Sequence, residues 1–302
     1  MTEPSSTARA LPVFAMVGGI WGSSFLFIEV ITDETGPMEV VTGRLFFGVL
    51  AISAYMLWTR RRVRVTPRLL LHVSVLAMAS NVIPFTLISW AEEHIQSGTA
   101  SVLNSTMPVF TAVFAAALLD EERFTRPRLV GLALALGGVA VLTGEDALDI
   151  TDSSVQGQLA VVAAAACYSM GAIYSRNLLA SNEPLDLSVL QVGIGFLFSI
   201  PITLAVTGGS PGFSLSLQAW ASLIALGVLG TGLAYVFYLW LIEHVGSVRA
   251  SLVTYVIPVV AVFLGWAVLD ETVGLNTVIG GLLIIAGVAS VLRGQVPARR
   301  SS

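Results

Sequence analysis

The amino-acid sequence predicts an all-α integral membrane protein, with ten transmembrane helices arranged as two inverted five-helix repeats. Three observations support this fold class: an apolar composition, an alternating placement of arginine, and a second half that repeats the first. The 302 residues are 55% hydrophobic and 11% charged, and their mean hydropathy is +0.85. A soluble domain of this length carries about twice that share of charged residues. Most of the chain is therefore expected to lie in the membrane.

The expected helices follow from apolar runs of roughly 20 residues, the length that crosses about 30 Å of hydrocarbon. Each run must be helical because backbone polar groups in lipid need hydrogen bonds within their own segment. In order, the helices are expected at residues 11–31, 37–58, 68–90, 97–118, 126–143, 155–175, 185–206, 217–241, 247–269 and 274–292. The repeats then cover 11–143 and 155–292, with tails at 1–10 and 293–302 and a connecting loop at 144–154. The run at 11–31 has no small-residue cleavage pattern, so we expect a helix rather than a signal peptide.

Arginine supplies all of the basic side chains except histidine, and all but one of the 15 arginines fall in alternate aqueous segments. These are Arg9, Arg60, Arg61, Arg62, Arg64, Arg68, Arg123, Arg126, Arg128, Arg176, Arg249, Arg293, Arg299 and Arg300. Because cytoplasmic loops retain arginine, the alternation predicts a multi-pass protein of the cell inner membrane with both termini cytoplasmic. The exception is Arg44, which lies inside the second expected helix.

The two halves of the chain match each other when the sequence is shifted by 150 residues. Residues 80–142 then pair with 230–292 without a gap, and the matches include tryptophan, histidine, proline, glycine and Asp-Glu positions. A shift of 147 aligns the earlier helices and pairs Trp21 with Tyr168 and Arg44 with Gln191. Five helices per half is an odd number, so the second copy must enter the membrane upside down. This architecture is suited to alternating access around a central site.

Short sequence motifs recur in both halves. Trp21-Gly22-Ser23-Ser24-Phe25 and Arg44-Leu45-Phe46 occur early, and Ala100, Pro108, Glu121, Gly131 and Gly137 are repeated as Ala250, Pro258, Glu271, Gly281 and Gly287. In these motifs, their order and the span count, the chain resembles the drug/metabolite transporter superfamily, in its ten-helix EamA-type branch. The resemblance implies a membrane carrier of small metabolites, often an exporter of amino acids or related compounds, without naming a substrate.

Arg44 is the most informative of the candidate site residues. It lies seven residues into its helix, about 10 Å deep, where a charge must face the protein interior or water. One interpretation is an anion-binding arginine that holds a substrate carboxylate or phosphate. The other is a structural role, in which Arg44 pairs with Glu29, near the end of the first helix, or with helix-end carbonyls.

Polar and aromatic residues at membrane depth complete the candidate substrate-binding set, which is Trp21, Arg44, Asn81, Asn104, Tyr235, Thr254 and Tyr255. Pro108 and Pro258 are expected to kink their helices and to free the carbonyls of Asn104 and Thr254. Each polar residue can alternatively serve helix packing or an interhelical hydrogen bond. Each aromatic residue can alternatively face lipid or a packed core.

Small residues and charged pairs are expected to have structural roles. Glycines along 126–143 and 274–292 permit close contact, so these two helices are expected to form a scaffold pair. The pairs Asp120-Glu121 and Asp270-Glu271 are expected to cap the following helices or to bind nearby arginines, with gating as the alternative.

The sequence contains no protease, hydrolase or phosphate-loop motif and no Cys/His cluster, so we expect neither an enzyme nor a metal or cofactor site. The leading prediction is a secondary transporter that exports small metabolites, above all amino acids or related compounds. An efflux carrier for multiple drugs or cationic compounds is the alternative, and a channel or non-transporting scaffold is the prediction from a different class. The expected partners are a small-molecule substrate, the lipid bilayer and, as a candidate coupling ion, the proton; nucleic acid is not expected.

Overall fold

The computed structural model describes residues 6–61, 63, 65–118, 125–144, 151–179, 182–245, 250 and 253–293, and within these it has helices and no strands. The first repeat contains α1 (Ser6–Thr32), α2 (Pro37–Trp58), α3 (Pro67–Ala77), η1 (Met78–Val82), α4 (Ile83–Glu92), α5 (Ser97–Asn104), α6 (Met107–Leu118) and α7 (Arg126–Thr143). The second contains α8 (Ser153–Leu179), α9 (Pro184–Val206), α10 (Leu217–Ala225), η3 (Leu226–Leu233), α11 (Ala234–Val245), α13 (Val253–Val268) and α14 (Leu275–Arg293).

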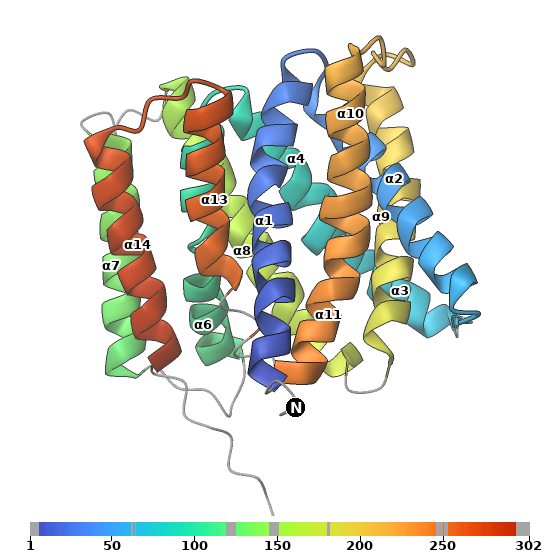
Figure 1. The fold of residues 1–302 in the computed structure, drawn as a ribbon, viewed down its shortest axis with the longest axis horizontal. Helices are drawn as coiled ribbons and strands as arrows, with labels where there is room; N and C mark the ends of the chain where they lie inside the picture. The colour runs from blue at the N-terminus through green and yellow to red at the C-terminus, as the bar shows by residue number, and fades with distance from the viewer. Residues whose placement is uncertain are drawn as a thin grey trace, which may run out of the picture.

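The predicted fold class is confirmed. Within the described ranges, nine continuous helical runs are long and apolar enough to cross a membrane, and Val253–Val268 is a shorter apolar helix. This shorter helix corresponds to the ninth expected span, whose first residues fall mostly outside the described part of the chain. The helices run side by side, and α1 begins and α14 ends at the same end of the bundle (Figure 1). We refer to this as the terminal end, and to the other as the distal end.

Two of the expected α-helices are interrupted by π-helical turns. η1 separates α3 from α4, and η3 separates α10 from α11, at matching places in the two repeats. A π-helical turn inserts an extra residue into the α-helical hydrogen-bond pattern, and such turns are frequent at functional sites. Periodicity alone did not predict them, because one inserted residue changes a 25-residue apolar run very little.

The two proline positions behave differently. The run 97–118 is broken at residues 105–106, and α6 begins at Met107 immediately before Pro108. Proline lacks the N–H that would bond to the carbonyl four residues earlier, which for Pro108 is the carbonyl of Asn104. In the other repeat, by contrast, α13 continues through Pro258.

Each repeat contributes its first helix to the other half of the bundle. α1 packs mainly against α13, α10 and α11, whereas α8 packs mainly against α4, α5 and α6. Close contacts also repeat across the two halves: a Cβ added at Gly230 would lie 2.8 Å from Ser24 Oγ, and one added at Gly171 would overlap Ser80 Oγ. Two inverted repeats that interlock are expected to produce both features: the packing of each first helix against the other repeat, and the paired close contacts.

The predicted scaffold pair is present in the structure. α7 and α14 lie side by side at one edge of the bundle (Figure 1) and form its most extensive helix–helix contact. Their backbones approach so closely that a Cβ added at Gly131 would lie 2.6 Å from Gly287 O, and one added at Gly138 would lie 2.7 Å from Gly280 O. The glycines therefore allow this contact. The pair lies at the edge of the bundle and not at its centre.

Candidate functional site

The centre of the candidate site is the Arg44 side chain on α2, which is 8% exposed. Its Nε–H donates to Thr231 Oγ1 at 2.8 Å, and its guanidinium carbon lies 3.7 Å from the centroid of the Phe85 ring. Tyr168, Tyr235 and Glu92 are the titratable side chains in its electrostatic surroundings. A hydroxyl group and an aromatic face thus contact a cation that is buried between the two repeats.

The predicted ion pair between Arg44 and Glu29 is not found. Glu29 Oε2 is buried and has no hydrogen-bond partner among the described residues, and the charges of Glu271 and Asp33 act on Glu29. The reason is that Arg44 reaches Thr231 of η3 and the Phe85 ring of α4 instead. The loop between α1 and α2 is short, but the two side chains point to different neighbours.

A second polar contact is the symmetry counterpart of the first. Gln191 on α9 donates from Nε2 to Asn81 Oδ1. Gln191 occupies the position of Arg44 in the second repeat, and Asn81 occupies the position of Thr231 in the first. Asn81 and Thr231 are both fully buried, and they lie in η1 and η3 respectively. A polar side chain from the second helix of each repeat therefore reaches the π-helical turn of a third helix, once in each direction across the pseudo-two-fold axis.

Trp21 is anchored at the same π-helical turn. Its indole Nε1–H donates to Gly230 O at 3.1 Å. Its ring lies 6.4 Å from the Tyr235 ring and 5.0 Å from the Tyr238 ring. The symmetry counterpart of Trp21, Tyr168, lies 6.3 Å from the ring of Phe85. Aromatic side chains therefore surround the two polar contacts on the α1 and α8 sides.

The structure brings together four of the seven predicted site residues: Trp21, Arg44, Asn81 and Tyr235. Asn104 lies at the end of α5, and its buried Oδ1 has no hydrogen-bond partner among the described residues. Thr254 and Tyr255 lie on α13, and the Tyr255 ring packs against the main apolar core. The membership of Asn104, Thr254 and Tyr255 in the site thus remains a prediction.

Several residues of the site were not predicted as members. Thr231 and Gln191 could have been found, because the shifts of 150 and 147 align them with Asn81 and Arg44. Phe85 gives no sequence signal that distinguishes it from other apolar residues. Glu92 was missed because the expected span ended at residue 90, whereas α4 continues to Glu92.

The distal end contains a carboxylate cap that links the two repeats. Glu271, just after α13, accepts hydrogen bonds from Ser97 N (2.8 Å), Ser97 Oγ (2.6 Å) and Gly98 N (3.1 Å). The expected capping role is therefore present, but the capped helix is α5 of the first repeat and not the following helix α14. Asp120 and Glu121, the matching pair, lie outside the described residues.

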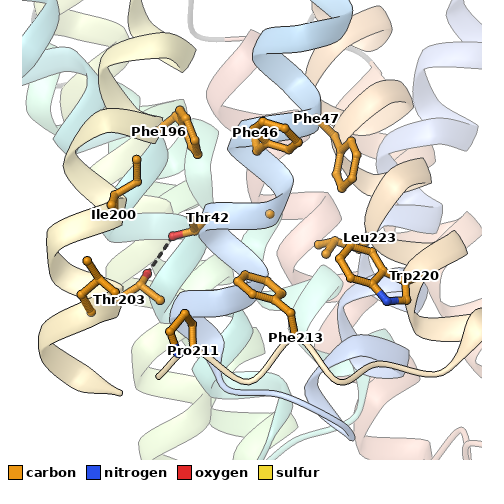
Figure 2. Close-up of a pocket in the computed structure, with 12 residues that line it drawn as sticks. Thr42, Phe46, Phe47, Phe196, Ile200, Thr203, Pro211, Phe213, Trp220 and Leu223 are labelled. Carbon is orange, nitrogen blue, oxygen red and sulfur yellow. Dashed lines mark hydrogen bonds between the residues drawn. The ribbon is translucent and has the colours of Figure 1, made fainter. Parts of the chain in front are cut away.

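A separate apolar pocket of about 340 Å³ lies between α2, α9 and α10 (Figure 2). Phe46, Phe47 and Phe196 lie at one side of it, and Phe213 and Trp220 at another, as Figure 2 shows. The two threonine hydroxyls at its wall, Thr42 and Thr203, are 2.7 Å apart and hydrogen-bond to each other. None of the predicted site residues lines this pocket. The pocket is therefore distinct from the polar centre around Arg44.

The described residues form nine membrane-length helical runs and a shorter apolar helix, arranged as two interlocked repeats with a buried polar site where the repeats meet. This is a transporter architecture. Comparison with known proteins agrees: the chain belongs to the EamA-like transporter family, whose profile matches residues 10–144 and 155–293. The match occurs twice, once in each repeat, and so reproduces the internal duplication.

Curated relatives along nearly the whole chain are transporters. A protein of Streptantibioticus cattleyicolor named "probable terminal-alkyne amino-acid exporter" is 30% identical over 287 residues, covering 93% of each chain. A Bacillus subtilis protein named "uncharacterized transporter YoaV" is 24% identical, and the match covers 89% of this chain and 91% of that protein. An Escherichia coli K12 protein named "uncharacterized inner membrane transporter YedA" is 24% identical, and the match covers 87% of this chain and 85% of that protein.

A solved crystal structure has the same fold. It superposes with a TM-score of 0.64 at 19% sequence identity and covers 96% of this chain and 98% of the other. The family match, the relatives and the membrane-length helices together show that the protein is a multi-pass membrane transporter.

Proposed function

We propose that the protein is a secondary transporter that exports amino acids or related small metabolites by alternating access around Arg44. The observation that carries this proposal is the environment of the guanidinium. Its Nε–H donates to a neutral hydroxyl, Thr231, and its face rests on the Phe85 ring. Neither contact neutralises the positive charge, so the charge is available to a substrate carboxylate.

The surrounding side chains fit the remaining groups of an amino acid. A planar guanidinium binds a carboxylate through two parallel hydrogen bonds, which fixes the orientation of the ligand. Aromatic rings such as Trp21 and Tyr235 attract an ammonium group and pack against an apolar side chain. The relative named as an amino-acid exporter supports this substrate class.

The symmetry of the site supports alternating access. The Arg44–Thr231 contact and the Gln191–Asn81 contact are equivalent under inversion of the repeats. Rocking one half against the other would loosen these contacts in turn and open the centre first to one side and then to the other. The placement of arginine supports an orientation with the terminal end in the cytoplasm, so that export runs from the terminal end to the distal end.

Thermal unfolding of the purified protein with added ligands tests the proposal. A ligand that binds the folded state stabilises it by about RT ln(1 + [L]/Kd), so even weak substrates shift the melting temperature at high concentration. We expect stabilisation by a subset of amino acids, and loss of this effect in Arg44→Gln. Arg126→Gln is the matched control, because Arg126 is an exposed arginine at the terminal end. Equal stabilisation of both variants would contradict the role of Arg44.

Export of lipophilic or cationic drugs is a second candidate function, favoured by the apolar pocket of Figure 2. Its aromatic lining suits an apolar ligand. Drug export predicts that dyes rather than amino acids stabilise the protein. It also predicts that Phe46→Ser weakens the stabilisation by dyes and that Arg44→Gln does not. Stabilisation by neither class, together with no flux in liposomes, would favour a channel or scaffold.

A further inference from the structure

Glu92, the final residue of α4, is a buried acid without hydrogen-bond donors. Its side chain is 3% exposed, and neither carboxylate oxygen has a hydrogen-bond partner among the described residues. The backbone of Glu29 is a polar neighbour of this carboxyl group, but it does not meet hydrogen-bond geometry. Burial without hydrogen-bond donors strongly disfavours the charged carboxylate form and favours the neutral carboxylic acid.

The charges that face Glu92 come from three other segments. They are Glu29 on α1, Glu271 after α13, and Arg44 on α2. Glu29 is in turn acted on by Glu271 and Asp33, and its own Oε2 is buried without a partner. Two of the three charges around Glu92 are therefore negative. Neighbouring like charges disfavour one another's ionisation, so at least one of these acids is expected to hold a proton.

Glu271 differs from the other two acids because it has donors. Two backbone N–H groups and one hydroxyl at the start of α5 bond to its carboxylate. These three donors satisfy the Glu271 carboxylate at the N-terminus of α5, whereas the buried carboxylate oxygens of Glu92 and Glu29 have no such partner among the described residues. The proton then belongs with Glu92 and Glu29.

We propose that Glu92, together with Glu29, forms a proton-binding site that controls the contact between Glu271 and α5. A proton from water adds to a carboxylate oxygen and leaves a neutral carboxylic acid. Its release restores a negative charge beside Glu271 and repels it from the first repeat.

The position of this site suggests how a proton would act on transport. Glu92 ends α4 in the first repeat, whereas Glu271 follows α13 in the second, and both lie at the distal end. Loss of the proton therefore weakens the contact between repeats at the end that must open for release. This coupling rests on the proposed export function, whereas the proton-binding site itself does not.

A pH titration of the full-length protein in detergent tests the site without a substrate. Infrared difference spectra report the carbonyl band of a buried carboxylic acid, and melting temperatures are measured from about pH 5 to about pH 9. We expect the wild type to show the band and to lose stability as the pH rises and the proton dissociates. In Glu92→Gln, which resembles the protonated acid, the band should be lost or halved and the pH dependence should flatten. Glu93→Gln is the matched control, because Glu93 is adjacent but exposed, and it should retain both features.

The outcomes separate the two proposals. A folded Glu92→Gln variant with the full band and the wild-type pH slope would overturn the proton site. If that variant does not fold, Glu29→Gln provides the same test, and an unchanged titration again counts against the site. A confirmed titration without any amino-acid flux would refute the export function alone, whereas flux with no titrating acid would refute the proton site alone.

Discussion

Replacement of Gly131 by alanine should push α7 and α14 apart locally and lower the stability of the protein. The added Cβ would lie 2.6 Å from Gly287 O and 2.5 Å from Val291 Cγ2. The valine can change rotamer, but the carbonyl is backbone of α14 and cannot move alone. Overpacking costs about 1–3 kcal/mol. Alanine recovers about 1 kcal/mol of helix propensity relative to glycine. Because a backbone atom is involved, we expect a cost near the upper limit and a net loss of about 1–2 kcal/mol.

Gly137 provides the matched control on the same helix. A Cβ at this position has nothing within 4 Å. Gly137→Ala therefore gains helix propensity without a collision and should be at least as stable as the wild type. For a protein of this size, each kcal/mol corresponds to roughly 2–4 °C in melting temperature. Thermal unfolding of the two variants in the same detergent measures the difference. A Gly131→Ala variant as stable as Gly137→Ala would refute the reasoning from close backbone contact.

Three further predictions concern single interactions. Thr231→Val leaves the Nε–H of Arg44 without its acceptor, so the free energy of unfolding should fall by about 1–3 kcal/mol in thermal or chemical unfolding. Trp21→Phe removes the hydrogen bond to a carbonyl of η3 and should cost about 0.5–1.5 kcal/mol, whereas an unchanged melting temperature would show that the bond contributes nothing. The pKa of Glu34 is lowered from 4.5 by hydrogen bonds from the side chain and backbone of Ser216, so its ionised form stabilises the fold above about pH 4.5 and this contribution is lost as the pH falls through the folded pKa. Ser216→Ala should therefore be less stable than the wild type at neutral pH and should lose less of its melting temperature on acidification, and parallel curves for the two proteins would contradict this.

The fold could be predicted from the sequence because its signals act over long segments. Hydropathy defines spans of about 20 residues, and the arginine alternation and the repeat each draw on many positions. The glycines of α7 and α14 were informative for a related reason: close helix contact in a membrane requires small residues. The π-helical turns were not predictable, because the insertion of one residue leaves the hydropathy of η1 and η3 unchanged.

The site was only partly predictable, because its contacts depend on which way single side chains point. Arg44 stands out as a charge at membrane depth, but the ion pair with Glu29, one of its two interpretations, is wrong. Sequence distance favoured that acid, whereas the packing of α2 against η3 directs the guanidinium to Thr231. Glu92 was missed for a different reason. The expected span ended two residues before it, so this buried acid was expected to lie in a loop. Internal symmetry predicts further members of the site, because it relates Gln191 to Arg44 and Asn81 to Thr231.

The most direct test of the proposed function is amino-acid exchange in liposomes that contain the purified protein. Liposomes loaded with one unlabelled amino acid at a time are diluted into the same labelled amino acid, and uptake of label is measured. We predict saturable uptake that depends on the internal amino acid for the wild type and for Arg126→Gln, and none for a folded Arg44→Gln variant. Equal exchange by the Arg44→Gln variant, or no exchange of any amino acid by the wild type, would contradict export around Arg44.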